Sequence, residues 1–184
     1  MLIETKRLIL REMEESDYED LAKMLQDDDV MYAYEGAFSD EEVRAWLERQ
    51  IGRYRDDGFG LWAVILKENG EMIGQCGLTM QDIPAGRVVE TGYLFRKEYW
   101  HRGYAGEAAA ACTDYGFDIL GVKEIFSVIR DTNTASRNVA KRNGMEERGM
   151  FVKHYRGTDM PHCIYSVRRE DRHGNESGER TAEE

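Results

Sequence analysis

A strand, a helix and a second strand follow one another between residues 88 and 129, and this order limits the fold more than any other feature of the sequence. Val88 to Phe95 and Glu124 to Ile129 have the composition of strands, while Gly103 to Leu120 has the apolar spacing of a helix. Gly121 stands where a helix commonly ends in a left-handed residue. Such a crossover is right-handed in nearly all proteins. In open sheets the ligand usually binds beyond the carboxyl ends of the strands, where the strand order is interrupted.

Two further strand-like runs precede this crossover. Leu61 to Leu66 is rich in branched and aromatic residues, and Met72 to Met80 forms the second run. The Asn69-Gly70 pair between them is typical of a tight hairpin turn. Together with residues 88–95, these runs predict an antiparallel meander.

The remaining elements are helices with recognisable starts and a terminal hairpin. Ser16 and Ser39 each precede a glutamate by three residues, which is the capping-box pattern. Asn133 is placed to cap a short helix that Gly144 closes. The predicted order is β-α-α-β-β-β-α-β-α-β-β, an α/β (α+β) fold with a mixed sheet. The other predicted strands are residues 8–10, 145–155 and 160–167.

The length of 184 residues fits one domain with a tail. We expect the domain to span residues 1–168. Residues 170–184 contain six acidic and two basic side chains and almost nothing apolar. Residues 169–184 are therefore predicted to form a disordered acidic tail.

Composition excludes several classes of protein. A net charge of −11, from 36 acidic and 25 basic residues, argues against nucleic-acid binding. The longest apolar run has six residues, so no membrane span is expected. The first residues lack the apolar stretch of a signal peptide. Three cysteines without a C-x-x-C motif favour reduced thiols, and we expect a cytoplasmic protein.

Positive charge is concentrated in one part of this acidic chain. Residues 137–156 contain six basic and two acidic side chains, which is typical of a solvated face or of an anion site. Gly103 and Gly106 lie at a helix start next to Arg102, where backbone N–H groups and the helix dipole favour a pyrophosphate. Tight packing is the alternative reason for these glycines. The segment has neither the Gly-Lys-Ser/Thr of a P-loop nor the G-x-G-x-x-G of a dinucleotide site.

Five blocks of the chain follow one another in a recognisable order: residues 4–11, 58–64, 73–78, 99–108 and 133–145. Together they resemble the GNAT superfamily of acetyl-CoA-dependent N-acetyltransferases, and within it the ribosomal-protein N-terminal acetyltransferase-like (RimJ/RimL-like) branch. The resemblance covers about residues 2–167 and implies a mostly antiparallel mixed sheet flanked by helices. Trp100 stands where many relatives have Gln or Arg, as is common in this branch. Ala140 stands where many of these enzymes have a tyrosine acid, so that role does not transfer.

The resemblance implies roles for individual residues. Glu90 would be the general base, with a pKa raised by burial, although a solvent-facing strand residue is the alternative. Ser136 would donate a proton to the leaving thiolate, and Asn133 would hold the pantetheine arm or a water as well as capping its helix. Backbone N–H groups near Leu94 and Phe95 would polarise the thioester carbonyl. The implied cofactor-binding residues are Leu94, Phe95, Arg96, His101, Arg102, Gly103, Tyr104, Ala105, Gly106, Asn133 and Arg137.

The expected activity is transfer of an acetyl group from acetyl-CoA to a primary amine by direct attack in a ternary complex. The acceptor is a protein N-terminus or a small amine, and the acidic mean charge favours a cationic one. A non-catalytic CoA-binding or partner-binding module on the same fold is the alternative. No metal is expected, because the histidines and cysteines lack ligand spacing. We expect a monomer or a homodimer.

Overall fold

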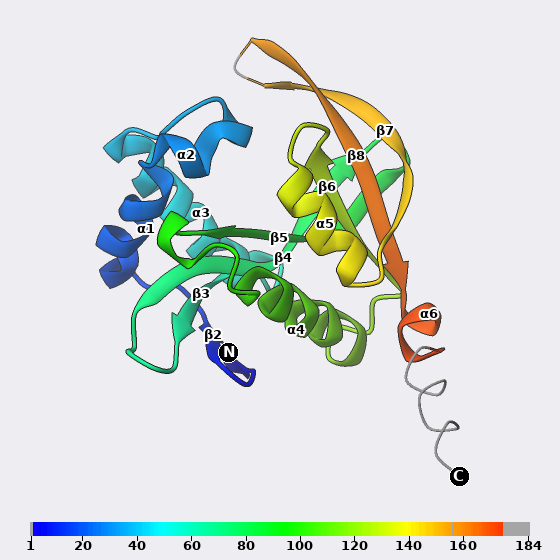
Figure 1. Ribbon diagram of the computed structural model, residues 1–184, viewed down its shortest axis with the longest axis horizontal. Helices are drawn as coiled ribbons and strands as arrows, with labels where there is room; N and C mark the ends of the chain where they lie inside the picture. Colours follow the sequence, from blue (N-terminus) through cyan, green and yellow to red (C-terminus); the bar gives the residue numbers. More distant parts are fainter. Residues whose placement is uncertain (1, 156, 175–184) are drawn as a thin grey trace.

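The computed structural model describes residues 2–155 and 157–174, which build one eight-stranded sheet with helices packed on both faces (Figure 1). The strand order is β1-β2-β3-β4-β5-β6-β8-β7. The strands are β1 (Leu2–Glu4), β2 (Leu8–Arg11), β3 (Leu61–Leu66), β4 (Met72–Ile83), β5 (Gly86–Phe95), β6 (Glu124–Arg130), β7 (Glu146–Tyr155) and β8 (Thr158–Arg168).

Six α-helices and three 3-10 helices connect these strands in the described part of the chain. The α-helices are α1 (Tyr18–Leu25), α2 (Asp28–Met31), α3 (Asp40–Asp56), α4 (Tyr104–Asp118), α5 (Thr134–Arg142) and α6 (Arg169–Gly174). The 3-10 helices are η1 (Glu15–Asp17), η2 (Tyr32–Tyr34) and η3 (Lys97–Tyr99). None of the helices formed by residues 2–155 and 157–174 has the length and apolarity that a membrane crossing requires.

The sheet is interrupted between β5 and β6. These two strands are parallel and are joined through α4, which confirms the predicted crossover. The other neighbouring strands are antiparallel, and the predicted meander of β3, β4 and β5 is confirmed. The register of β5 with β6 contains one pair, Glu90 opposite Phe126. Residues 91–95 of β5 therefore have one edge without a strand partner, on the side where β6 departs.

One of the two predicted capping boxes is confirmed and the other is wrong. The N–H of Ser39 donates to Glu42 at 2.8 Å, and the N–H of Glu42 donates to the Ser39 hydroxyl at 3.3 Å. Ser16 instead lies inside η1. The capping box at this place begins two residues earlier, with Glu14 as N-cap and Asp17 as its third helical residue. The Asp17 carboxylate accepts the N–H of Glu14 at 2.8 Å.

Strand β3 has a core on each face of the sheet, which explains its continuous apolar sequence. Leu61 and Ala63 pack into the cluster that contains α1 and α3. Trp62 and Val64 pack into the cluster that contains α4. Successive side chains of a strand point to opposite faces, so a strand covered on both faces is apolar at every position.

The predicted tail falls partly within the described residues. Residues 169–174 form α6, where the sequence predicted disorder. The α6 residue Arg172 donates to the backbone oxygens of Asn143 and Ala110, both at 3.2 Å, and these bonds fix α6 against the domain. Residues 175–184 of the predicted tail lie outside the described residues.

Gly52 offers a test of local helix stability. It lies inside α3, its φ is not in the left-handed region, and a Cβ added there would come no closer than 3.9 Å to the Arg55 side chain. Gly52→Ala should therefore raise the free energy of unfolding by about 0.5–1 kcal/mol, because alanine loses less conformational entropy in a helix than glycine does. Urea unfolding measures the change, and a lower midpoint would contradict it.

Candidate active site

Helix α4 begins directly after a left-handed glycine. Gly103 has φ of 80° and is followed by Tyr104, the first residue of α4. Glycine adopts this conformation without the steric cost that a Cβ imposes. The N–H groups in the first turn of a helix have no partner within the helix, and the dipole adds partial positive charge there. This end of α4 is therefore suited to bind an anion.

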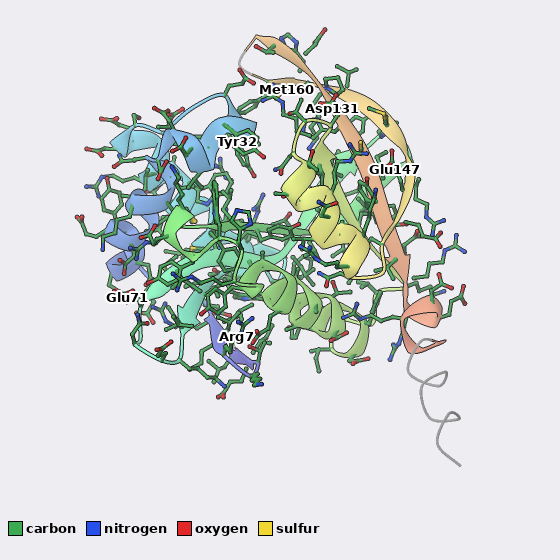
Figure 2. All side chains as sticks on the ribbon, viewed as in Figure 1. Arg7, Tyr32, Glu71, Asp131, Glu147 and Met160 are labelled. Carbon is green, nitrogen blue, oxygen red and sulfur yellow. The ribbon has the colours of Figure 1, made fainter. Side chains whose placement is uncertain are left out.

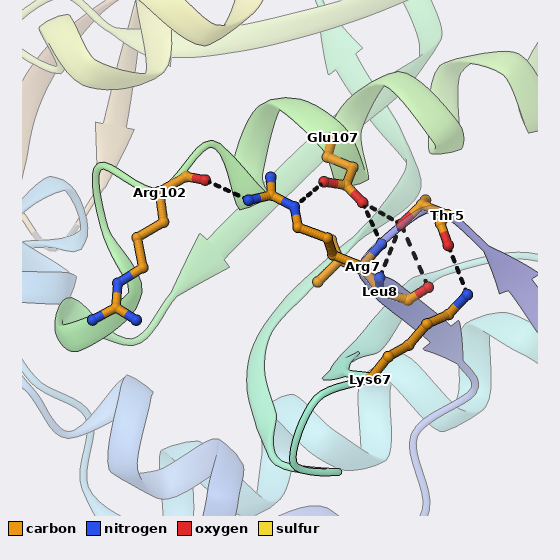
Figure 3. A network of polar contacts seen from close by, with 6 residues as sticks. All are labelled: Thr5, Arg7, Leu8, Lys67, Arg102 and Glu107. Carbon is orange, nitrogen blue, oxygen red and sulfur yellow. Dashed lines mark hydrogen bonds and ion pairs between the residues drawn. The ribbon is translucent and has the colours of Figure 1, made fainter.

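A polar network fixes the loop before α4 (Figure 3). The Arg7 guanidinium donates to the Arg102 carbonyl at 2.9 Å and to the Glu107 carboxylate at 2.7 Å. Thr5 donates its hydroxyl to the other oxygen of Glu107 at 2.6 Å. The Arg7 guanidinium also lies 4.4 Å from the ring centre of Tyr104. The N-terminal strand pair thus sets the position of the loop through contacts that are distant in sequence.

A cavity of about 310 Å³, which we call the loop cavity, opens beside the start of α4. Helix α5 forms another wall and contributes Arg142, a cation of the basic segment. Trp100 stands at the rim and is held by a bond from its indole N–H to the Phe95 carbonyl at 2.8 Å. The predicted cofactor residues that line the loop cavity are Leu94, Phe95, His101, Gly103, Tyr104, Ala105, Gly106 and Asn133.

A second cavity of about 660 Å³ lies between α2, α3 and the splayed strands, and we call it the Glu90 cavity. Tyr34, Phe38 and Trp46 form a cluster of edge-to-face aromatic rings in its wall. Figure 2 shows Tyr32 of η2 on the helical side of the molecule, and Asp131 and Met160 on the side of β6 and β8. The charged or titratable residues that line the Glu90 cavity include Arg49, Arg53, Glu90, Arg130, Lys153, His154 and His162.

The two cavities meet at the point where β5 and β6 separate. Tyr93, Leu94, Asn133 and Ser136 line both cavities. Asn133 caps α5 as predicted, since its side-chain oxygen accepts the N–H of Ser136 at 3.1 Å. The Tyr93 hydroxyl donates to the Ser136 carbonyl at 3.1 Å, which ties β5 to α5 across the gap. A group bound in one cavity would therefore contact a group bound in the other at these residues.

Glu90 points from β5 toward helix α3. Leu94 packs with the α1–α3 cluster and Tyr93 packs with the α4 cluster, so strand alternation places Glu90 on the α3 face. Burial raises the pKa of Glu90, and this rise is opposed by the charge of Lys153 and by the bond from the Val128 N–H at 2.9 Å. Glu90 is thus a carboxylate of raised pKa inside a cavity, which is the setting of a general base.

Three predicted cofactor residues lie away from the lining of both cavities. The Arg137 guanidinium donates to the Tyr165 hydroxyl at 3.0 Å and lies 3.5 Å from Glu147, so it is turned toward β7 and β8. Arg96 pairs with Glu98 on η3. The Arg102 guanidinium lies 5.6 Å from the ring centre of Tyr99. Helix α5 does place a cation in the loop cavity, but this cation is Arg142 and not the expected Arg137.

Helix α3 and the turns before it contribute residues to the Glu90 cavity that the sequence patterns did not predict. Tyr34, Arg49 and Arg53 belong to the N-terminal half of the chain and reach the Glu90 cavity because α3 covers the face of β5 that carries Glu90. The signal available in the sequence was the spacing of Arg49 and Arg53, four residues apart on one helix face. Tyr93 carries no such signal, since tyrosine is common in strands.

The fold is that of an acetyltransferase. Residues 7–146 match the family described as acetyltransferase (GNAT) domain, and the chain belongs to the GNAT acetyltransferase family. The identification made from the sequence blocks is thereby confirmed, and the chain is an acetyltransferase enzyme of this family.

Known proteins similar to this chain agree with that assignment. Two come from Bacillus subtilis (strain 168): the uncharacterized protein YkkB, 36% identical over 88% of this chain and 92% of that protein, and the uncharacterized N-acetyltransferase YnaD, 32% identical over 83% and 87%. A GNAT-family acetyltransferase from Bacillus anthracis has a TM-score of 0.79 and 27% identity, covering 92% of this chain and 99% of that one. RimL, a ribosomal L7/L12 α-N-protein acetyltransferase solved with coenzyme A, shares the fold at a TM-score of 0.76 and 18% identity, covering 91% and 98%.

Proposed function

We propose that the protein transfers an acetyl group from acetyl-CoA to a primary amine, with acetyl-CoA in the loop cavity and the amine in the Glu90 cavity. The observation that carries this proposal is the shared lining of the two cavities by Leu94, Asn133 and Ser136, with Glu90 in the second cavity. Two substrates bound in these cavities would have their reacting groups together, which supplies the proximity that a bimolecular transfer needs. The donor is the one that GNAT folds use, and a structural neighbour, RimL, was solved with coenzyme A.

The residues of the loop cavity match the chemistry of the donor. The start of α4 offers N–H groups and the positive end of a helix dipole to a pyrophosphate, and Arg142 adds a full charge. The edge of β5 from residue 91 to 95 has no strand partner and offers backbone N–H groups to an extended amide chain, as an added strand would use them. The carbonyls of Thr91 and Phe95 already accept the Ser127 hydroxyl and the Trp100 indole N–H. Backbone N–H groups on the same edge would stabilise the oxyanion that forms at the thioester carbon.

Glu90 and Ser136 would move the protons of the reaction. The amine attacks only when neutral, so Glu90 takes a proton from it, directly or through water. The C–N bond then forms while the C–S bond breaks. The nitrogen sheds a proton as it becomes an amide, and this proton reaches the leaving thiolate through Ser136, whose hydroxyl gives one proton and regains another. The described cysteines, Cys76, Cys112 and Cys163, are buried and do not line either cavity. This favours direct attack over an acetylated cysteine intermediate.

Ser136→Ala should lower kcat by roughly 10²-fold, the lower end of what a positioned acid contributes, while leaving the affinity for coenzyme A unchanged. Single-turnover kinetics with acetyl-CoA measures the first quantity and calorimetry the second. Thr134→Ala is the matched control, because Thr134 is exposed at the start of the same helix and lines neither cavity. Equal kcat values for the two variants would remove Ser136 from the mechanism.

The proposed function is tested by thiol release from acetyl-CoA in the presence of a panel of amines that includes ribosomal-protein N-terminal peptides, amino acids and polyamines. Turnover with at least one amine class and calorimetric binding of coenzyme A are the expected results. Binding of coenzyme A without turnover of any amine would overturn the catalytic proposal. A burst of acetyl-enzyme on Cys76 or Cys112 would overturn direct attack.

A further inference from the structure

The Glu90 cavity carries the opposite charge to the protein as a whole. The chain has a net charge of −11, yet four arginine or lysine side chains line this cavity and Glu90 is the single carboxylate among its described lining residues. One cation, Arg130, is neutralised, since it pairs with Glu35 and donates to the Tyr32 carbonyl. The surplus positive charge therefore rests on Arg49, Arg53 and Lys153.

Arg49 and Arg53 are close enough to affect each other. Burial and the charge of Arg49 lower the pKa of Arg53, and the charges of Asp57 and Glu90 oppose this shift. They lie four residues apart on α3, so their side chains share one face of the helix. The Arg53 guanidinium donates to the side-chain oxygen of Gln50 at 3.0 Å, and the Arg49 guanidinium lies 5.1 Å from the Trp46 ring centre. Within the described residues, neither arginine forms an ion pair. Like charges at this spacing repel each other, and an anion between them would remove that repulsion.

A buried polar group in the same cavity also lacks a partner. Gln75 is 0% exposed, and its side-chain nitrogen has no hydrogen-bond acceptor in the described part of the chain. Its oxygen accepts the indole N–H of Trp46 at 3.0 Å, which fixes the nitrogen as the free end. A buried donor without an acceptor is costly, so the cavity is built for a ligand that brings oxygen atoms.

We propose that the amine acceptor carries a carboxylate, which Arg49 and Arg53 bind while Gln75 donates a further hydrogen bond. This inference rests on the proposed function and names the substrate class of the same site. A guanidinium pairs with a carboxylate through two parallel hydrogen bonds, so two arginines on one helix face form a suitable receptor. Glu90 lines the same cavity and would face the amino group of this acceptor. The acceptor is thus a zwitterion, contrary to the cationic acceptor that the mean charge favoured.

The carboxylate can come from a free amino acid or from an acidic residue near a peptide N-terminus, and matched acceptor pairs separate these sources. The first pair is an amino acid and its amide, and the second is a peptide with glutamate at its second position and the same peptide with glutamine. Initial rates with saturating acetyl-CoA give kcat/KM for each acceptor. Calorimetry on the protein with coenzyme A measures acceptor binding independently of turnover.

The carboxylate form of at least one pair should have a kcat/KM about 10- to 100-fold above that of its amide, and the same form should bind more tightly in calorimetry. Arg53→Gln and Arg49→Gln should each reduce that ratio toward one. Arg55→Gln is the control on the same helix, because the Arg55 side chain is 79% exposed, pairs with Asp56 and does not line the cavity.

Equal rates and equal binding within both pairs would overturn the inference, as would a ratio that Arg49→Gln and Arg53→Gln leave unchanged. Faster turnover of a polyamine than of any carboxylate-bearing amine would overturn it as well. Failure of the proposed function would give a result distinct from failure of this inference. In that case no acceptor is acetylated, while calorimetry still reports whether the carboxylate form binds and whether Arg53→Gln abolishes that binding.

Discussion

Glu90→Gln should lower kcat by about 10²-fold or more at neutral pH, the range that a positioned general base contributes. Glutamine keeps an oxygen that accepts the Val128 N–H and has nearly the same volume, so the fold and the cavity walls remain. It has no basic group that takes the proton of the attacking amine. Steady-state kinetics with the best acceptor from the amine panel measures the loss.

The pH profile separates a catalytic Glu90 from a structural one. Burial raises the pKa of Glu90, so the wild-type rate should rise with pH as this carboxyl loses its proton, in a range above the ordinary glutamate value. The Gln variant should lack that limb of the profile. Glu48→Gln is the control, because Glu48 is an exposed carboxylate on α3 that lines neither cavity. Identical profiles for wild type and Glu90→Gln would show that Glu90 is not the base.

The same raised pKa predicts a stability effect with a defined sign. The folded protein holds a proton on Glu90 at pH values where the unfolded chain has already released it. The contribution of Glu90 to the free energy of unfolding is therefore fully present below the ordinary glutamate pKa. This contribution is lost as the pH rises through the raised pKa of the folded protein. The difference in unfolding free energy between Glu90→Gln and wild type should grow over that pH window in favour of the variant. Urea titrations at a series of pH values measure this difference.

Gly77→Ala should destabilise the protein by about 3 kcal/mol or more, at or beyond the upper end of the usual cost of overpacking. Gly77 lies in β4 at the centre of the sheet, opposite Leu61 and Gly92. A Cβ at this position would lie 2.1 Å from the carbonyl oxygen of Gly60 and 2.8 Å from the Cα of Leu61. Both atoms belong to buried backbone, at the first residue of β3 and at the residue before it, so the clash cannot be relieved by a side-chain rotation.

A loss of this size is a large part of the stability of an ordinary domain. We expect Gly77→Ala to show a markedly lower urea midpoint, or to accumulate as insoluble protein at 37 °C. Gly52→Ala is the matched control, since it adds the same methyl group at a site with open space. A midpoint for Gly77→Ala within error of wild type would mean that β3 and β4 can separate without cost, against the packing described above.

Local patterns predicted the elements whose causes lie within a few residues. The crossover through α4 followed from strand and helix spacing on either side of Gly103, and the Asn133 cap followed from the preference of helix starts for short polar side chains. Ser16 is not a cap because a 3-10 turn begins before it, with a capping box between Glu14 and Asp17. Boundaries of this kind depend on competition between neighbouring polar groups.

The environments of the basic residues between 137 and 156 could not be predicted from local patterns. Helical spacing indicated that Arg137 and Arg142 lie on α5, but not what faces each of them. The sheet order places β8 next to β6, so Arg137 meets the Tyr165 hydroxyl, while Arg142 reaches the loop cavity. Lys153 of β7 comes instead to the Glu90 cavity. One segment of like charge is thereby divided among three environments.

The sequence by itself determined the order of the main strands and helices, the start of a helix after Gly103, and the family. Each follows from residues close together in the chain or from the order of such segments. Only the tertiary structure decided that β5 and β6 separate beyond Glu90, and that Arg49 and Arg53 of α3 meet Glu90 in one cavity. These arrangements come from packing between segments distant in the chain, and the free energy of such contacts depends on partners that no local spacing identifies.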